Sequence, residues 1–197
     1  MKLIFVNYAH PEIPHISGVR LWRFAQELAS QGHQVIHITA TIHKENGTSS
    51  GSLSVLLEKH DWKRPLHIAI EPKHRIMLSL ARNGSLPNIV RKTVTFYAMI
   101  IRGGVFYDWT DAAKLFIKEL GGLFKPDLVW GTFGNSSNLH LAREISKSSG
   151  SKLVLDFKDS INAFVPLGMR WLFSQKYKAA CGVSCNALAQ GKEACHF

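Results

Sequence analysis

The first forty residues constrain the fold more than any other part of the chain. Two apolar segments, 2–7 (KLIFVN) and 33–40 (HQVIHITA), are separated by a helical pattern over 19–31 that ends at Gly32. Continuous apolar runs of this length are typical of strands covered on both faces. A glycine after the last helical turn is a common stop signal. This short strand–helix–strand unit predicts two parallel strands joined by a right-handed crossover.

The alternation of strand and helix patterns continues along the chain. Further strands are predicted at 65–72, 126–132, 152–157 and 181–184, and helices at 87–102, 109–123, 135–150, 167–180 and 186–193. The helix at 109–123 has an apolar side made of Ala112, Leu115, Phe116, Leu120 and Leu123. The pattern predicts a single Rossmann-like α/β/α domain over residues 1–197, with a mostly parallel sheet.

The charge balance predicts the kind of partner. Lys and Arg number 24 against 14 Asp and Glu, which gives a formal charge of +10 and favours anionic partners. Nucleic acid ranks last among these, because aromatic and basic residues are not interleaved and no recognised motif is present. The apolar segment 94–101 (VTFYAMII), flanked by basic residues, is too short to cross a bilayer. It is expected to be either a core helix or a segment that lies on an anionic membrane surface.

Several classes of site have no support in the sequence. The start, MKLIFVNYAHPEIP, has no export signal, which predicts a cytoplasmic location and three reduced cysteines. The ten histidines do not cluster along the chain, and the cysteines have poor spacing for zinc, so no metal site is expected. Dinucleotide, Walker and serine-hydrolase motifs are missing, so no cofactor is expected.

Candidate site residues follow the predicted strands, because ligands of open α/β sheets bind beyond the carboxyl ends of the strands. After the first strand, Gly18 would let a phosphate approach the start of a helix, with Arg20 as its charge partner, although an ordinary helix-start glycine explains the position equally well. Gly131 and Gly134 are expected to leave room for a ligand before the helix at 135–150.

The segment 151–160 (SKLVLDFKDS) raises a separate question, because an apolar strand runs directly into ionisable side chains. These are Asp156, Lys158 and Asp159. Charge at a strand end belongs either to a solvated turn or to a site, and the residues alone leave both readings open.

Three segments, taken in order, resemble the N-terminal domain of glycosyltransferase family 4. They are SGVRLWRFAQELASQGHQVIHITA, KPDLVWGTFGNSSNLHLAREISKSSGSKLVLDFKDS and YKAACGVSCNALA. The stretch at 156–159 is similar to the "D-F-R-D" branch of the family, which is associated with polysaccharide and lipopolysaccharide synthesis. The resemblance spans nearly the whole chain.

The resemblance implies the N-terminal half of a GT-B enzyme, which transfers a sugar from a nucleotide-sugar donor to a glycan or lipid-linked acceptor. It implies donor-phosphate contacts at Gly18 and Arg20, and a catalytic group made of Asp156, Lys158 and Asp159. It implies acceptor contacts at Tyr107, Asp108, Trp109, Thr132 and Asn135. Asp159 is expected to contact the acceptor or the transferred sugar, and Lys158 to stabilise charge.

The sequence also departs from the family pattern. Ser17 replaces one glycine of the usual pair, and Lys158 stands where many members have a histidine. The chain ends at Phe197, about where a linker to the donor-binding domain is expected, so the chain alone is expected to transfer no sugar. A non-catalytic binding or scaffolding module, or a truncated pseudoenzyme, is the alternative. The expected location is cytoplasmic, at the inner face of the membrane.

Overall fold

The computed structural model describes residues 1–42 and 53–156. The predicted elements at 167–180, 181–184 and 186–193 lie outside the described residues, as do Lys158 and Asp159. In chain order the elements are β1 (Lys2–Val6), α1 (Ile16–Ser30), β2 (Gln34–Ala40), α2 (Leu53–Lys59), β3 (Leu66–Ile70), α3 (Ile76–Arg82), α4 (Asn88–Ile100), α5 (Tyr107–Phe124), β4 (Leu128–Thr132), α6 (Ser136–Ser149) and β5 (Lys152–Asp156).

The strands form one parallel sheet in the order β3-β2-β1-β4-β5. The central strand β1 pairs with β2 on one side and β4 on the other, so that Ile4 lies beside Ile36 and Val129. The sheet therefore grows outward from β1 in two directions, with β2 and then β3 on one side and β4 and then β5 on the other. The chain changes its direction of winding at β1. The predicted α/β class with a parallel sheet is confirmed, and within the described residues every strand pair is parallel.

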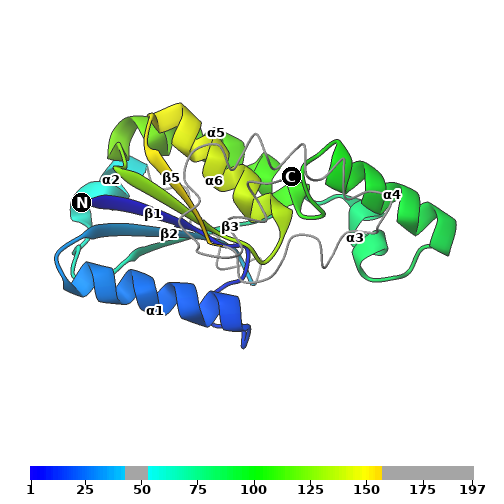
Figure 1. Cartoon of the computed structure of the whole chain (residues 1–197), viewed down its shortest axis with the longest axis horizontal. Coiled ribbons are helices and arrows are strands. Elements are labelled where there is room, and N and C mark those ends of the chain that lie inside the picture. The colour runs from blue at the N-terminus through cyan, green and yellow to red at the C-terminus, as the bar shows by residue number, and fades with distance from the viewer. Residues whose placement is uncertain (43–52, 157–197) are drawn as a thin grey trace, which may run out of the picture.

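Helices cover both faces of the sheet and make the fold a three-layer α/β/α structure (Figure 1). Successive side chains of a strand point to opposite faces, so each strand contributes side chains to two separate cores. Helix α1 packs on a core that includes Leu3, Phe5 and Val35, whereas α5 and α6 pack on a larger one that includes Ile4 and Ile36. The two cores are the main source of stability, because burial of apolar area drives folding.

The buried side of helix α5 overlaps in part with the side that the sequence pattern predicts. Its buried apolar residues are Trp109, Ala113, Ile117, Leu120 and Phe124. Of the predicted residues, Leu120 is buried and Phe116 packs against the core. Leu123, expected in the core, is 47% exposed. The indole of Trp109 sets this orientation, because it is fully buried and donates a hydrogen bond from Nε1 to the backbone oxygen of Thr39, at 3.2 Å.

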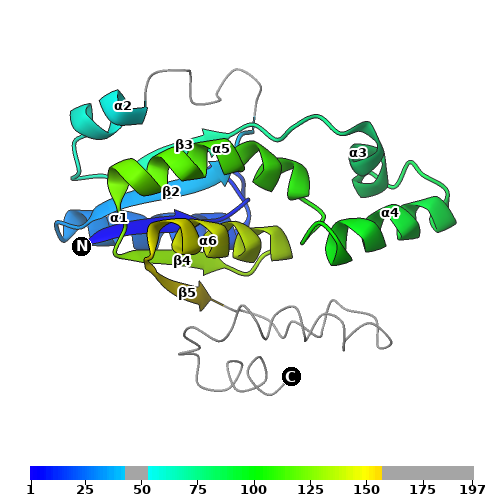
Figure 2. The same ribbon diagram turned by 90° about the horizontal axis from the view of Figure 1, so that it is seen from above.

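Helices α3 and α4 form a hairpin that projects past the carboxyl ends of the strands (Figure 2). The structure confirms the predicted helix at 87–102 as α4 and adds the short helices α2 and α3. Among the described helices, none has the length and apolarity that a membrane span requires.

Gly131 of β4 is a packing position and does not provide room for a ligand. A Cβ atom at this residue would lie 2.7 Å from Cβ of Ala142 on α6 and 3.3 Å from Cδ2 of Leu155 on β5. The expectation that Gly131 leaves space beside α6 is therefore wrong, because the helix and the neighbouring strand fill that space. The absence of a side chain lets α6 approach the sheet closely.

We predict opposite effects of alanine at two glycines. Gly131→Ala lowers the free energy of unfolding by about 1–3 kcal/mol, because the added methyl group overpacks the contact between β4 and α6. Gly122→Ala on α5 raises it by about 0.5–1 kcal/mol, because no atom lies within 4 Å of the added methyl group and alanine favours the helix. Urea unfolding of both variants measures the difference. Equal effects of the two substitutions would contradict the close packing at Gly131.

Candidate functional site

A polar cluster joins α1 to the carboxyl ends of β4 and β5. The guanidinium of Arg20 donates a hydrogen bond to the carboxylate of Asp156, and the hydroxyl of Thr132 donates to the same carboxylate at 2.7 Å. Nη2 of Arg20 also lies 3.4 Å from Oγ1 of Thr132. Both charged side chains are partly exposed. The structure thus brings together three residues that the sequence places as separate candidates, and it pairs the charge of Asp156 with a cation.

Asn138, at the start of α6, connects the ends of β1 and β4. Its amide nitrogen donates to Oδ1 of Asn7 at 3.1 Å and to the backbone oxygen of Thr132 at 3.0 Å. Its amide oxygen accepts a hydrogen bond from the backbone nitrogen of Tyr8 at 2.8 Å. Asn138 is fully buried, so this network is protected from water. The sequence analysis missed both asparagines.

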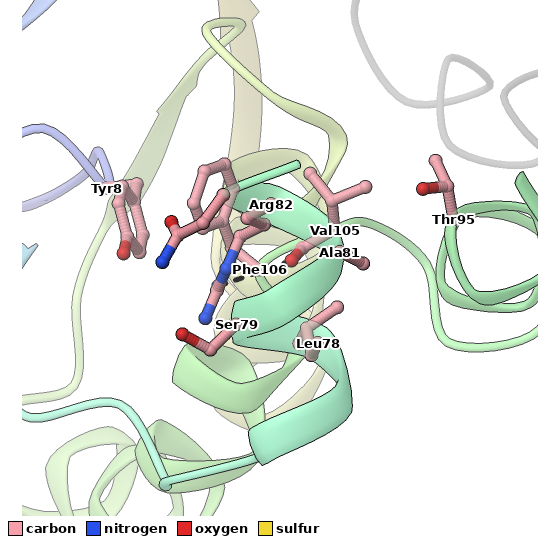
Figure 3. A pocket seen from close by; sticks show the side chains of 9 residues that line it. Tyr8, Leu78, Ser79, Ala81, Arg82, Thr95, Val105 and Phe106 are labelled. Atoms are coloured by element: carbon pink, nitrogen blue, oxygen red, sulfur yellow. Dashed lines mark hydrogen bonds between the residues drawn. The ribbon is translucent and has the colours of Figure 1, made fainter. Parts of the chain in front are cut away.

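A cavity of about 560 Å³ lies between the loop after β1 and helix α3 (Figure 3). Its wall combines aromatic, hydroxyl, amide and guanidinium groups. The lining residues are Tyr8, Leu78, Ser79, Ala81, Arg82, Asn83, Thr95, Val105 and Phe106. The Tyr8 and Phe106 rings pack together with 4.0 Å between centroids. A cavity with apolar walls and a few polar groups is typical of small-molecule sites.

The orientation of Arg82 in this cavity depends on Asp108. The guanidinium donates two hydrogen bonds to the Asp108 carboxylate, at 3.0 and 2.7 Å, and lies 5.2 Å from the centroid of the Phe106 ring. Asp108 is almost fully buried, so it supports the cavity from behind and its charge is balanced by Arg82. A two-point contact of this kind holds a guanidinium in one plane.

The hydroxyl of Tyr8 keeps its proton at neutral pH. Burial raises the pKa of Tyr8; the charge of Arg82 opposes this effect and the charge of Asp108 adds to it. The phenol therefore remains a hydrogen-bond donor at the wall of the cavity.

The remaining predicted site residues lie in different environments. Trp109 is buried in the core, and it can affect a ligand only through the residues that it supports. Tyr107 lines a separate groove between α3 and α4. Asn135 caps α6 by accepting a hydrogen bond from the backbone nitrogen of Asn138 at 3.2 Å.

Gly18 lies under the loop that follows β1. A Cβ atom at Gly18 would lie 2.9 Å from the backbone oxygen of His10 and 3.3 Å from that of Ala9. The loop can close onto α1 because residue 18 has no side chain. This packing explains the glycine without a ligand, and the contact of Gly18 with a phosphate stays a prediction.

Three histidines that are distant in the sequence meet on the α1 face of the sheet. His37 of β2 and His67 of β3 are register partners with ring centroids 5.8 Å apart, and the His10 ring lies 4.7 Å from that of His67. Trp22 of α1 stacks on His37. Although the histidines do not cluster along the chain, the parallel register gathers them. Within the described residues, no group of three or more His, Cys, Asp or Glu is arranged to hold a metal ion.

The histidine cluster is neutral in the folded protein. Burial, together with the charges that His67 and His10 would carry, lowers the pKa of His37 to about 3. Burial and His10 lower the pKa of His67 to about 4. Neither ring nitrogen of His37 has a hydrogen-bond partner in the described part of the chain. A positive charge on the His37 ring would be shielded from water by burial and repelled by charges on the neighbouring histidines.

We predict that acidification destabilises the fold through these histidines. Below pH 6.5, His37 and His67 bind protons in the unfolded chain but stay neutral in the folded protein. Their contribution to the free energy of unfolding is therefore fully present above that pH and is lost as the pH decreases toward 4. The loss between pH 7 and pH 5 is about 2–4 kcal/mol. Urea unfolding at the two pH values measures it.

A non-titrating ring at position 37 tests the origin of this effect. His37→Phe reduces the pH dependence, whereas His74→Phe, at an exposed histidine outside the cluster, keeps the dependence of the unmodified protein. If both variants retained the full dependence, the histidine cluster would not be its source.

None of the models of known protein families matches the chain, and no curated protein matches it.

Proposed function

We propose that this domain is the acceptor-binding half of a glycosyltransferase. In this proposal a sugar passes from a nucleotide-sugar donor to a cell-envelope polysaccharide or a lipid-linked acceptor. The observation that carries the proposal is the cavity beside Tyr8, at the same edge of the sheet as Arg20, Thr132 and Asp156. The similarity of the sequence to family 4 glycosyltransferases supports it.

The cavity suits the hydroxyl-rich part of an acceptor. Ser79 and Asn83 offer hydroxyl and amide groups, and Tyr8 offers a phenol that stays protonated. Such groups orient a sugar through hydrogen bonds, whereas the aromatic surface of Phe106 contacts its apolar side. Arg82 adds a cation whose position is held by Asp108.

Arg20 is the residue that we assign to the donor phosphates. Transfer leaves negative charge on the departing nucleoside diphosphate, and a preorganised cation lowers the barrier by stabilising that charge. Asp156 holds Arg20 in position through the ion pair, and Thr132 holds Asp156. Gly18 and Asn135 complete the proposed cleft, together with Lys158 and Asp159, which lie outside the described residues. A donor-binding half is needed for turnover.

The proposed place of action is the inner face of a membrane. The +10 charge favours an anionic lipid surface. Phe96, Tyr97 and Ile101 are exposed, whereas Met99 and Ile100 pack against the core. Segment 94–101 therefore has one side in the core and one exposed apolar side that could contact a membrane surface.

A second candidate is a binding or scaffolding module without catalysis. The same cavity would then hold a glycan or a partner without any transfer. Turnover with a donor-binding half separates the two candidates, because a scaffold binds the acceptor and releases no nucleoside diphosphate.

We predict that Arg20 is required for transfer in the two-half enzyme. Arg20→Gln lowers kcat/KM by about 100-fold, because one preorganised charge on the leaving group is lost. The control is Arg23→Gln, at an exposed arginine on the same helix, which leaves kcat/KM unchanged. Release of nucleoside diphosphate in the presence of cell-envelope acceptors is the measurement. Equal activity of the two variants would remove Arg20 from the reaction.

We predict that blocking the cavity affects the acceptor alone. Ser79→Phe fills space between α3 and the loop after β1, and it raises the acceptor KM about tenfold while the donor KM is unchanged. Ser85→Phe, at an exposed position that does not line the cavity, serves as the control. A rise in the donor KM, or equal acceptor KM values for the two variants, would contradict acceptor binding in this cavity.

A further inference from the structure

A second cavity lies in the hairpin formed by α3 and α4. It is a groove of about 690 Å³, within the range of ~300–1,000 Å³ that is typical of small-molecule sites. Its wall is mainly apolar, and cations stand at one side. The lining residues are His74, Arg75, Ile76, Met77, Leu78, Thr93, Val94, Tyr97 and Tyr107. Figure 2 shows the hairpin beyond the end of the sheet.

The apolar side chains of the groove are exposed to an unusual degree. Ile76 is 63% exposed and Met77 is 50% exposed. Tyr97 of α4, which also lines the groove, is 48% exposed. Exposed apolar side chains gathered around one groove mark a site for an apolar ligand or partner.

Basic residues predominate in the segment that forms the groove. Residues 72–107 contain six Lys or Arg residues and no Asp or Glu. The six are Lys73, Arg75, Arg82, Arg91, Lys92 and Arg102. Such a segment attracts an anion and repels a cation. The groove is therefore complementary to a molecule that is both apolar and negatively charged.

Asp111 leaves positive charge in excess at the groove. Its carboxylate is shared by Arg75 at 2.9 Å, Arg102 at 2.5 Å and Lys114 at 3.1 Å. Burial alone would raise the pKa of Asp111, but hydrogen bonds and charges from Lys114 and Arg102 outweigh burial and lower it. One carboxylate balances only one of the three cations. Arg75, which lines the groove and lies 5.1 Å from the centroid of the Tyr107 ring, remains attractive to an anion.

The groove adjoins the cavity described above. Leu78 lines both, so the apolar groove and the more polar cavity meet at α3. A molecule with a polar head and a hydrocarbon chain matches this arrangement, since its two parts prefer different surroundings.

We infer that the groove between α3 and α4 binds the hydrocarbon chain of an anionic single-chain amphiphile, with the head group beside Arg75. The identification of this amphiphile with a lipid-linked acceptor rests on the proposed function. Of the two acceptors proposed above, the groove favours the lipid-linked acceptor over a free polysaccharide. The binding itself involves only residues of the hairpin and of the first turn of α5.

Three soluble probes test the inference on the purified chain by calorimetry below their micelle concentrations. Dodecyl phosphate has the chain and the charge, butyl phosphate has the charge with a short chain, and dodecyl maltoside has the chain without the charge. Dodecyl phosphate is expected to bind at least about tenfold more tightly than either of the other two. Equal affinity of all three probes would overturn the inference.

Two pairs of variants locate the binding. Met77→Ser weakens dodecyl phosphate binding about tenfold, whereas Val55→Ser, at a 42% exposed residue on α2, does not change it. Arg75→Gln weakens dodecyl phosphate and leaves dodecyl maltoside unchanged, with Arg91→Gln as the control. Equal effects within either pair would overturn the assignment to the groove.

Two further results distinguish this site from its alternatives. If the chain bound phosphatidylglycerol vesicles but not monomeric dodecyl phosphate, the hairpin would contact a membrane surface instead of binding a single amphiphile in the groove. This result would overturn the inference. The binding assay does not depend on glycosyl transfer. Amphiphile binding by the chain, together with no transfer after a donor-binding half is added, would therefore uphold the groove and reject the proposed function. Transfer by the two halves to a soluble glycan, without amphiphile binding, would do the reverse.

Discussion

The candidate site depends on one buried amide. Asn138 joins the end of β1 to the end of β4, because its side chain is bonded to Asn7, to the backbone of Tyr8 and to the backbone of Thr132. Tyr8 forms one wall of the cavity beside α3, and Thr132 orients Asp156 and with it Arg20. Both functions of the Asn138 amide are satisfied, whereas Nδ2 of Asn7 is buried without a hydrogen-bond partner among the described residues. Loss of the Asn138 side chain would leave further buried polar groups unpaired.

The elements that the sequence predicted well are those whose signals are local. The apolar runs of β1 and β2, and Gly32 and Gly150 after the helices, specify most of the sheet and its crossovers without knowledge of the tertiary structure. Helices α2 and α3 were not predicted from the sequence, because each has only seven residues, which is too few for a helical period of apolar residues to be recognised. The buried side of α5 was predicted in part: Trp109, Phe116 and Leu120 share the inward side of the helix, whereas Leu123, which the pattern also assigned to that side, is exposed.

The candidate site was predicted in part for the same reason. Arg20 and Asp156 were selected from their positions at a helix start and a strand end, and Thr132 from the resemblance to family 4 glycosyltransferases. The parallel sheet brings these positions together. Arg82 and Asn138 carry no local signal, since an arginine at a helix end and an asparagine in a helix are ordinary. The histidine cluster required knowledge of the register between β2 and β3. With that register, His37 and His67 are paired, so their side chains lie next to each other on one face of the sheet.

The attachment of the α3–α4 hairpin combines ion pairs with apolar contacts. Arg75 precedes α3, Arg82 ends it and Arg102 follows α4, and all three arginines are ion-paired to the first turns of α5, through Asp108 or Asp111. Ion pairs with partly exposed members weaken as salt increases, whereas the two apolar cores do not. The attachment of the hairpin therefore has two parts that respond differently to the solvent: the arginine ion pairs weaken as salt increases, whereas the contacts of Ala98, Met99 and Ile100 with the core do not.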